Sequence, residues 1–298
     1  MKQLVVRISE GIGNQLFMYA NAYALSKKFN YNLIIDNTSG YFKKKNQIRN
    51  YELNNFMIDS DIANKNLKFD SYSKNVKRKL LKIIDIFRSR KKFFTEPKNS
   101  QKKTGLIEIS LENYSNTIFI EGHFECEKYF IKYENEIKKL FKIRSNLIES
   151  NNKYINELKN CNSVSICIRQ NRYSERKDRN YLKSNQFLDD TINYIYKSID
   201  HIKKNVKNPK FFVWSNDLSN LGKYFNDSEF IFIDNKINKS INDFYLFSFC
   251  KHFIVGPTSF HWWGAWLNEN PNKICIRPSN LNPSNNIDFW PNDWIKIS

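Results

Sequence analysis

The chain has 298 residues, and its 48 Lys and Arg against 30 Asp and Glu give a formal net charge of +18. Hydrophobic residues make up 41% of the sequence and aromatic residues 15%, which supplies a packed core and excludes a disordered protein. No apolar run approaches the ~18 residues of a membrane-spanning helix, and the first residues do not have the pattern of a signal peptide.

Short apolar runs rich in β-branched and aromatic residues alternate with segments of helical periodicity. We expect strands at 4–8, 32–36, 117–121, 164–169, 211–215, 230–234, 252–256 and 273–277. We expect helices at 14–29, 128–142, 185–203, 243–250 and 259–267. This alternation predicts βαβ units with mainly parallel sheets. A polar, asparagine-rich stretch at 145–160 marks the boundary between two α/β domains, whose ligands are expected at the carboxyl ends of the strands.

The first strand runs into a turn that contains Gly11 and Gly13 and precedes a helix expected from Asn14. Glycine lets a backbone turn tightly and approach a ligand, and the free N–H groups of a helix start suit an anion or a sugar hydroxyl. The turn lacks the third glycine of a dinucleotide fingerprint, because Leu16 stands there. The pattern is compatible with a ligand-binding turn and with a plain structural turn.

The strand at 164–169 ends in a basic segment that begins with Arg169. A guanidinium offers a planar fork for phosphate oxygens, so Arg169 is the candidate phosphate ligand. We expect Arg176, Lys177 and Arg179 to lie in a solvated loop, and Cys167 to be a small buried hydrophobic residue. No cysteine or histidine spacing indicates a metal site.

A turn with the sequence Gly256-Pro257-Thr258-Ser259 precedes an aromatic helix near the end of the chain. Hydroxyl side chains cap such helix starts, and the helix dipole favours anions there. The segment therefore predicts either a phosphate cradle without a Walker lysine or an ordinary cap on a tryptophan-rich core helix. His261 has no partner histidine nearby in the sequence and is not expected to bind metal.

A basic amphipathic segment at 75–94 supports a competing class of function, a membrane-surface binding protein without catalysis. Its apolar residues recur at helical spacing: Val76, Leu80, Ile83, Ile84 and Phe87. Its polar side carries Lys77, Lys82, Arg88 and the basic run 90–92. An ordinary domain helix with a solvated face is the alternative, and no nucleic-acid-binding motif is recognisable, so nucleic acid is not an expected partner.

Four segments, in order, resemble the bacterial α-1,2-fucosyltransferases, glycosyltransferase family eleven. GIGNQLFMYANAYAL at 11–25 is similar to the family's GGxGNQxFxYxxxxxL opening, and EGHFECEKYF at 121–130 is similar to its GYxQSEKYF segment. SICIRQNRY at 165–173 resembles SxHxRRGDY. LFSFCKHFIVGPTSFHWWGAWL at 246–267 resembles LMSxCKHxIxxNSTFSWWxAWL.

The resemblance implies an α/β, GT-B-like fold in which two Rossmann-like domains face a cleft. Residues 1–155 would form the acceptor-side domain and residues 156–298 the nucleotide-sugar-binding domain. The implied reaction is inverting, metal-independent transfer of fucose from GDP-fucose to O2 of a galactose, in a glycan such as an O-antigen or capsule repeat unit. No cofactor is implied besides this donor. The expected place is the cytoplasm, with peripheral contact to the anionic inner face of the inner membrane and a lipid-linked acceptor.

The resemblance also implies roles for individual residues. Arg169 would grip the diphosphate, and Thr258, Ser259 and Phe260 would form the phosphate-binding helix start. Asp243 would contact the guanosine. Asn14, together with Gly11 and Gly13, would line the sugar-transfer site.

The chain departs from the family pattern at Glu10, Cys167, Gln170, Asn171, Arg172 and Pro257. Arg172 replaces the motif's acidic residue and is expected to face the diphosphate beside Arg169. A carboxylate is still needed to deprotonate the acceptor hydroxyl, and Glu175 in the same loop and Glu10 in the N-terminal turn are the candidates. A second enzyme hypothesis keeps the fold and uses another GDP-sugar or another acceptor.

Overall fold

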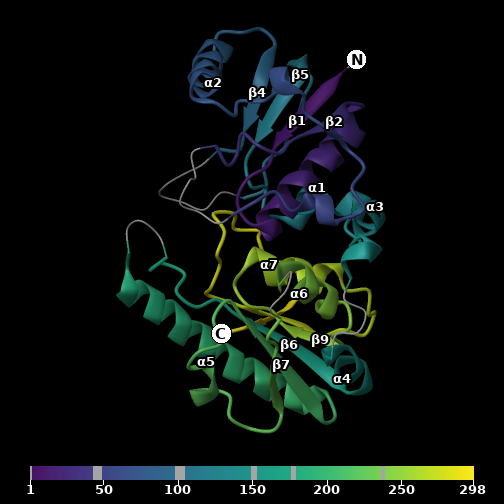
Figure 1. Cartoon of the computed structure of the whole chain (residues 1–298), viewed down its shortest axis with the longest axis vertical. Helices are drawn as coiled ribbons and strands as arrows, with labels where there is room; N and C mark the ends of the chain where they lie inside the picture. The colour runs from purple at the N-terminus through teal and green to yellow at the C-terminus, as the bar shows by residue number, and fades with distance from the viewer. Residues whose placement is uncertain (1, 43–48, 98–104, 149–152, 176–178, 236–238) are drawn as a thin grey trace. The chain divides into compact units, whose positions relative to one another are not determined.

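The computed structural model describes residues 2–42, 49–97, 105–148, 153–175, 179–235 and 239–298. The chain divides into two compact units (Figure 1). Unit 1 comprises Met1–Lys142 and Ser284–Phe289, and unit 2 comprises Ile143–Pro283 and Trp290–Ser298. The division falls before the polar stretch 145–160, whereas the boundary drawn from the sequence follows residue 155. A short segment near the end of the chain returns to unit 1.

Unit 1 is a parallel five-stranded sheet with helices, and its strand order is β3-β2-β1-β5-β4. The strands are β1 (Gln3–Arg7), β2 (Asn32–Asp36), β3 (Asp61–Ile62), β4 (Lys91–Thr95) and β5 (Tyr114–Glu121). The helices are α1 (Ile12–Phe29), α2 (Tyr72–Asp85) and α3 (Glu134–Leu140), with 3-10 turns at Leu53–Asn55, Lys65–Leu67, Glu127–Tyr129 and Ile131–Tyr133. Because β1 lies in the middle of the sheet, the turn that follows it is flanked by the ends of β2 and β5.

Unit 2 is a parallel six-stranded sheet with the order β11-β10-β9-β6-β7-β8. The strands are β6 (Asn162–Ile168), β7 (Pro209–Ser215), β8 (Phe230–Phe232), β9 (His252–Ile254), β10 (Cys275–Pro278) and β11 (Ile295–Ile297). The helices are α4 (Tyr154–Asn160), α5 (Tyr181–Asn205), α6 (Lys239–Phe247) and α7 (Ser259–Leu267), with 3-10 turns at Ser145–Leu147 and Leu221–Lys223. The chain adds strands on one side of β6 and then on the other, so the order reverses between β6 and β9.

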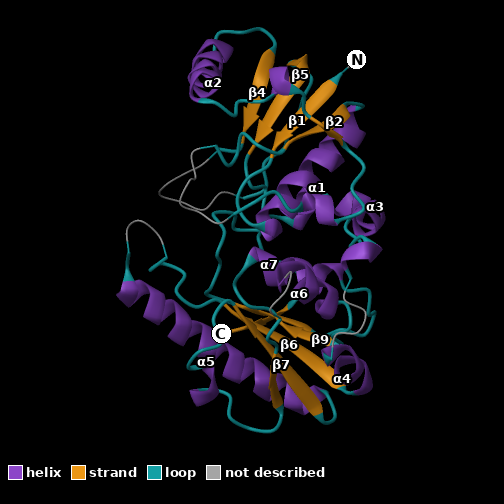
Figure 2. Ribbon diagram, viewed as in Figure 1, coloured by secondary structure: helices purple, strands orange, loops and turns teal. Residues whose placement is uncertain are grey.

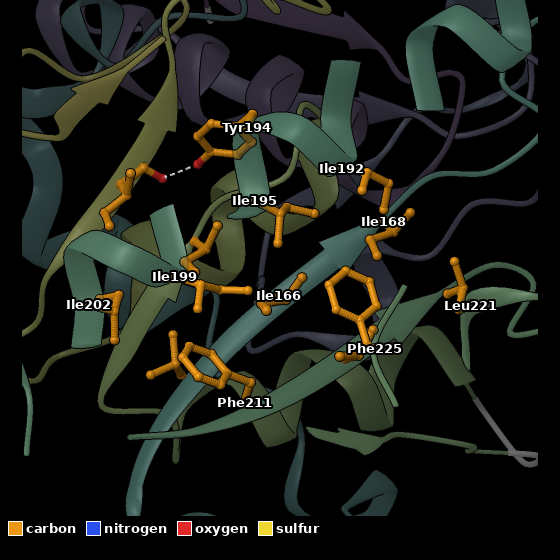
Figure 3. Packing of buried hydrophobic residues seen from close by; sticks show 14 of the residues in the cluster. Ile166, Ile168, Ile192, Tyr194, Ile195, Ile199, Ile202, Phe211, Leu221 and Phe225 are labelled. Carbon is orange, nitrogen blue, oxygen red and sulfur yellow. Dashed lines mark hydrogen bonds between the residues drawn. The ribbon is translucent and has the colours of Figure 1, made fainter. Parts of the chain in front are cut away.

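The core of unit 2 follows from the two-residue period of its central strands. Ile166 and Ile168 of β6 pack with Ile195 and Ile199 of α5 in one buried cluster (Figure 3). Alternate residues point to the other face of the sheet, where the ring of Trp214 in β7 lies 4.9 Å from the ring of Phe247 in α6, at a tilt of 52°. Helices therefore cover both faces (Figure 2), as expected for a buried parallel sheet.

Several expected elements have different bounds or types in the structure. The helix expected through 75–94 ends at Asp85, and β4 follows within the same segment. Asp85 is the last residue of this helix. Its carboxylate accepts the N–H groups of Lys92 (2.8 Å) and Phe93 (2.9 Å), so the end of the helix is bonded to the start of β4. The helix expected at 128–142 is two 3-10 turns followed by the short α3. The short edge strands β3, β4 and β11 were not expected.

Candidate functional site

The carboxyl edge of the unit 2 sheet brings together two segments that are distant in sequence. Arg169 follows β6, and Gly256 follows β9, the neighbouring strand. A Cβ on Gly256 would lie 1.9 Å from the carbonyl oxygen of Cys167, so only glycine allows this approach of the two strand ends. Cys167 is buried, as the sequence predicts. Ligands of open parallel sheets bind where the strand order reverses, which is here.

Arg169 is paired with Glu175 across the loop that follows β6. The guanidinium donates to the Glu175 carboxylate, with 24% of the arginine side chain and 46% of the glutamate side chain exposed. The loop closes through Asn171, whose carbonyl accepts from the Glu175 N–H at 3.2 Å. Asn171 has a φ of 58°, a left-handed conformation that suits the family's glycine and that asparagine tolerates. The structure thus joins the two sequence candidates of this loop.

Arg172 braces the neighbouring turn. Its guanidinium donates to the carbonyls of Pro257 and Pro283, both at 3.3 Å, and lies 5.1 Å from the centre of the Phe187 ring. These contacts fix Arg172 to the turn before α7, and its expected place beside Arg169 at a diphosphate stays a prediction. Gln170 likewise turns away, since its amide donates to the carbonyl of Asp217 at 2.5 Å. Of the loop's other cations, Arg179 is exposed, and Arg176 and Lys177 lie outside the described residues.

His261 fixes the turn that precedes α7 from inside the core. Its side chain is fully buried, and its Nδ1 accepts the N–H of Gly256 at 3.0 Å. Nε2 lies 2.7 Å from Ser165 Oγ, so the ring is assigned as the neutral tautomer that donates from Nε2. Burial lowers the pKa of His261 to about 3, which keeps the imidazole uncharged at neutral pH. The sequence reasoning excluded a metal role for His261 but missed this one.

The start of α7 presents the candidate phosphate-binding residues. Thr258 is the N-cap: its Oγ1 accepts the N–H of His261 at 3.2 Å, and its own N–H donates to the Gly256 carbonyl at 2.7 Å. Ser259 and Phe260 are the first residues of the helix, and all three are half-buried. The Phe260 ring meets Phe244 of α6 edge-on at 4.6 Å, which anchors the helix start against its neighbour.

Asp243 lies on α6 and is buried, with 5% of the residue exposed. One of its carboxylate oxygens accepts a hydrogen bond from the Asn235 side chain at 2.7 Å. Asn235 follows β8, which is separated from β6 by β7. Asp243 is therefore fixed beyond the end of β8, on the same carboxyl edge as Arg169 but two strands away.

The N-terminal candidates form a separate arrangement in unit 1. α1 begins at Ile12, earlier than expected, so Gly11 is its N-cap and Gly13 lies within its first turn. Asn14 is half-buried, and its N–H donates to the Gly11 carbonyl at 3.0 Å. Glu10, where the family has glycine, has a φ of 66° and holds the left-handed conformation itself.

Gln15, which the sequence reasoning did not single out, ties this turn to a neighbouring segment. Its side chain is fully buried and donates to the carbonyls of Glu10 (2.9 Å) and Asn50 (2.8 Å). Its Oε1 accepts the N–H of Glu52 at 2.9 Å. A glutamine within an apolar helix start is the signal that could have found it.

A shallow cavity of about 490 Å³, largely open to solvent, lies beside this turn. It is lined by Asn37, Thr38, Tyr41, Phe42, Asn50, Tyr51 and Asp70. The Tyr41 hydroxyl donates to the Glu10 carbonyl at 3.4 Å, and Asn50 is one of the partners of Gln15, so the cavity and the turn share residues. Burial raises the pKa of Tyr51 to about 12, so its phenol stays a neutral donor. The lining combines aromatic faces with amide, hydroxyl and carboxylate groups.

Comparison with known proteins places the chain in a family. Residues 3–298 match the family described as Glycosyl transferase family 11. An alpha-1,2-colitosyltransferase of Escherichia coli is 30% identical over 307 residues, covering 100% of this chain and 99% of the relative. The O-antigen biosynthesis glycosyltransferase WbnK of Escherichia coli is 26% identical over 314 residues, covering 96% and 98%.

The fold of the chain is also similar to the folds of solved structures. The crystal structure of NodZ alpha-1,6-fucosyltransferase soaked with GDP-fucose matches with a TM-score of 0.51 at 11% identity, covering 90% of this chain and 92% of that one. The α/β, GT-B-like fold class expected from the sequence is confirmed. In the part of the chain that the structure describes, no helix is long and apolar enough to cross a membrane. The chain belongs to glycosyl transferase family 11.

Proposed function

We propose that the protein transfers fucose from GDP-fucose to O2 of a galactose in a bacterial surface glycan, with inversion and without a metal ion. The observation that carries the proposal is that Arg169 and the turn before α7 follow neighbouring strands, β6 and β9, at the reversal of strand order in unit 2. The relative WbnK is named for O-antigen biosynthesis, which supports an O-antigen or capsule repeat unit as the acceptor. We place the reaction on the cytoplasmic side, at the inner face of the inner membrane, where a lipid-linked repeat unit would present the galactose.

The leaving GDP gains negative charge on its β-phosphate as the bond to the sugar breaks. Arg169 supplies a guanidinium fork for this charge, and the first N–H groups of α7 supply a fixed dipole. Because Thr258 Oγ1 already accepts from His261, its hydroxyl proton can be donated to a phosphate oxygen. A neutral His261 holds Gly256 in place without adding charge of its own. Asp243 is the proposed acceptor for the guanine N1–H and exocyclic amine.

The general base remains a choice between two carboxylates. Inversion places the attacking hydroxyl and the leaving phosphate on opposite faces of the sugar ring. Glu175 is paired with Arg169, the proposed phosphate ligand, so it can act as the base only if donor binding separates the pair. Glu10, in the turn of unit 1, is the alternative. The Glu175→Gln variant distinguishes the two candidates. A fall in kcat of ~10²–10⁴ would assign the general base to Glu175, and an active enzyme would exclude Glu175 as the base.

The cavity of unit 1 supports the proposed acceptor side. Galactose offers hydroxyls to polar groups and a C–H face to an aromatic ring, and the lining supplies both. Asp70 is already oriented, since it accepts from Thr38 Oγ1 at 3.1 Å and from Lys74 at 3.1 Å. We propose that Asn14, Gly11 and Gly13 line the sugar-transfer site.

A second candidate is transfer of colitose from its GDP-sugar. It is favoured by the relative that is 30% identical along the whole chain and is named an alpha-1,2-colitosyltransferase. Colitose lacks the 3-hydroxyl of fucose, so the two donors differ by a single hydrogen-bonding group. Discrimination by one such group ranges from modest to ~10⁴-fold, depending on whether the site pairs with it.

The test is incubation of the protein with GDP-fucose, GDP-colitose, GDP-mannose and UDP-galactose. Thermal shift and donor hydrolysis identify the donor, and transfer to a β-galactoside followed by linkage analysis identifies the product. We expect the 6-deoxy GDP-sugars to raise the Tm and the UDP-sugar to leave it unchanged. Failure of every GDP-sugar to bind would overturn the proposal, and selective turnover of GDP-colitose would replace the first candidate with the second.

A further inference from the structure

The helix α2 is mounted with its apolar side outward. Phe87, one residue beyond the C-cap, is 87% exposed, and Ile83 and Leu80 are 58% and 55% exposed. Val76 and Ile84 are exposed as well. These residues recur at helical spacing, and at 100° per residue they fall on one side of the helix. An ordinary domain helix buries this side, so the structure reverses the usual arrangement.

The opposite, charged side of α2 holds it on the sheet. Arg78 and Lys82 both donate to the carboxylate of Glu121, the last residue of β5, which is 8% exposed as a side chain. Burial by itself raises the pKa of Glu121, but the hydrogen bonds and charges of Arg78 and Lys82 outweigh it and keep the pKa below its usual range. Asp85 turns inward to the N–H groups of β4. The orientation of the helix is therefore fixed by a buried ionic cluster.

Cations border the outward apolar side. Lys77 and Lys79 are exposed on its two flanks, and Arg90 and Lys91 are exposed just beyond it. Residues 72–94 contain nine Lys and Arg and a single acid, the inward-facing Asp85. The exposed surface of this segment thus offers large apolar side chains within a positive border and no negative charge.

We propose that the outward side of α2 docks on an anionic lipid bilayer, with Leu80, Ile83 and Phe87 entering the boundary between headgroups and acyl chains. Charge complementarity selects this occupant, because anionic headgroups meet the flanking lysines while the acyl boundary takes the apolar stripe. A second copy of the chain would instead bring two positive borders together. The inference rests on the membrane location given under the proposed function, but it is independent of the donor sugar.

The experiment is co-sedimentation of the full chain with vesicles of 70:30 phosphatidylcholine and phosphatidylglycerol, without nucleotide sugar. We expect the wild type to bind these vesicles and not pure phosphatidylcholine vesicles. The variant Leu80→Ser/Ile83→Ser/Phe87→Ser should lose affinity on the order of a hundredfold, because its apolar burial is removed. The variant Lys77→Gln/Lys79→Gln should lose about fivefold for each cation. The matched control Lys132→Gln/Lys139→Gln, two exposed lysines of unit 1, should bind like the wild type.

A tryptophan probe tests insertion directly. All six native tryptophans are at most 7% exposed, so their fluorescence is shielded from lipid, and Phe87→Trp adds one reporter on α2. Brominated phosphatidylglycerol should quench Phe87→Trp and leave Met57→Trp, at an exposed position elsewhere in unit 1, unquenched.

Three results would overturn the proposal: no wild-type binding to anionic vesicles at low salt, equal binding by the triple serine variant, or a concentration-dependent dimer that the same variant abolishes. Circular dichroism and thermal unfolding verify that each variant is folded. Because no sugar donor is present, failure here leaves the donor assignment standing, and failure of every GDP-sugar leaves vesicle binding intact.

Discussion

Two turns of the molecule have the same topology but are held by different buried side chains. Each follows a central parallel strand and leads into a helix: residues 8–11 lead into α1, and residues 255–258 lead into α7. The first is held by a buried glutamine, Gln15, which satisfies three backbone groups around it. The second is held by a buried neutral histidine, His261, and by Arg172. The same supersecondary unit is stabilised by unrelated side chains.

The surroundings of the two turns differ in the side chains that line them. The turn before α7 has Arg169 on the adjacent strand end, which suits a diphosphate. The turn before α1 also has a guanidinium beside it, since a Cβ on Gly11 would lie 3.2 Å from Nη1 of Arg49, and it borders a cavity of aromatic and neutral polar groups with the carboxylate of Asp70. The shared fold therefore positions two helix starts, and under the proposed function the one beside Arg169 serves the donor and the one beside the cavity serves the acceptor.

The largest effect on activity is expected from substitution of Arg169 in unit 2. Arg169→Ala should lower kcat by ~10²–10³, because it removes the proposed stabiliser of the leaving phosphate. Arg169→Lys should recover part of the loss, since it keeps the charge but not the planar fork. Steady-state transfer and GDP binding by calorimetry measure both. Arg179→Ala, an exposed cation beyond the same loop, is the control, and equal turnover of the two alanine variants would contradict the assignment.

Gln15, which holds the turn in unit 1, should contribute to the stability of the fold. Gln15→Leu removes the buried side chain that bonds three partly buried backbone groups, so it should lower the free energy of unfolding by about 1–3 kcal/mol. Urea denaturation followed by circular dichroism measures the change. Gln186→Leu on the exposed side of α5 should change stability far less. If both variants are equally stable, Gln15 does not hold the turn.

His261, which holds the turn in unit 2, should affect how the stability of the fold depends on pH. The pKa of His261 is lowered to about 3 in the folded chain, below its ordinary value of 6.5. The unfolded chain therefore takes up a proton below about pH 6.5 that the folded chain refuses, and this costs about 1.4 kcal/mol of stability per pH unit as the pH falls.

His261→Gln removes this titration, so its stability should fall less steeply than that of the wild type between pH 6.5 and 4.5. Denaturation curves at several pH values measure the slopes. Above pH 7 the difference between the two proteins should be constant, which serves as the internal control. Parallel slopes throughout the acid range would show that His261 is not buried as a neutral group.

The smallest effect is expected in the cavity of unit 1. Tyr51→Ala removes an aromatic face and should raise the KM for the galactoside acceptor about fivefold, with the donor KM unchanged. Initial-rate kinetics with each substrate varied in turn separate the two constants. Tyr181→Ala, an exposed tyrosine on α5, should change neither. A rise in the donor KM alone would move the cavity to the donor side.

The strand-helix alternation and the position of Arg169 at the carboxyl edge of its sheet could be predicted from the sequence, because both depend on local pattern. Val164, Ile166 and Ile168 define a buried strand, and a cation directly after such a strand must reach the carboxyl edge of the sheet. The αL positions at Glu10 and Asn171 were visible only as departures from the family's glycines. The structure shows that both keep the glycine-like conformation.

The roles of His261, Gln15 and Arg172 could not be predicted, because each depends on a partner distant in sequence, such as Ser165 for His261 and Asn50 for Gln15. The orientation of α2 is the clearest case. Periodicity predicts that one side of a helix is apolar but does not say which side meets the protein. The deciding residue is Glu121, more than thirty positions away on β5.

The return of residues Ser284–Phe289 to unit 1 has a consequence for synthesis on the ribosome. Phe289 packs at 6.1 Å from Phe17 of α1, and Asp288 accepts from Lys128 at 2.6 Å, so unit 1 is complete only after these residues emerge. The translating chain must first make the whole of 143–283. At about 5–20 residues per second, the first unit waits on the order of ten seconds with an unfinished surface, which is when a chaperone would act.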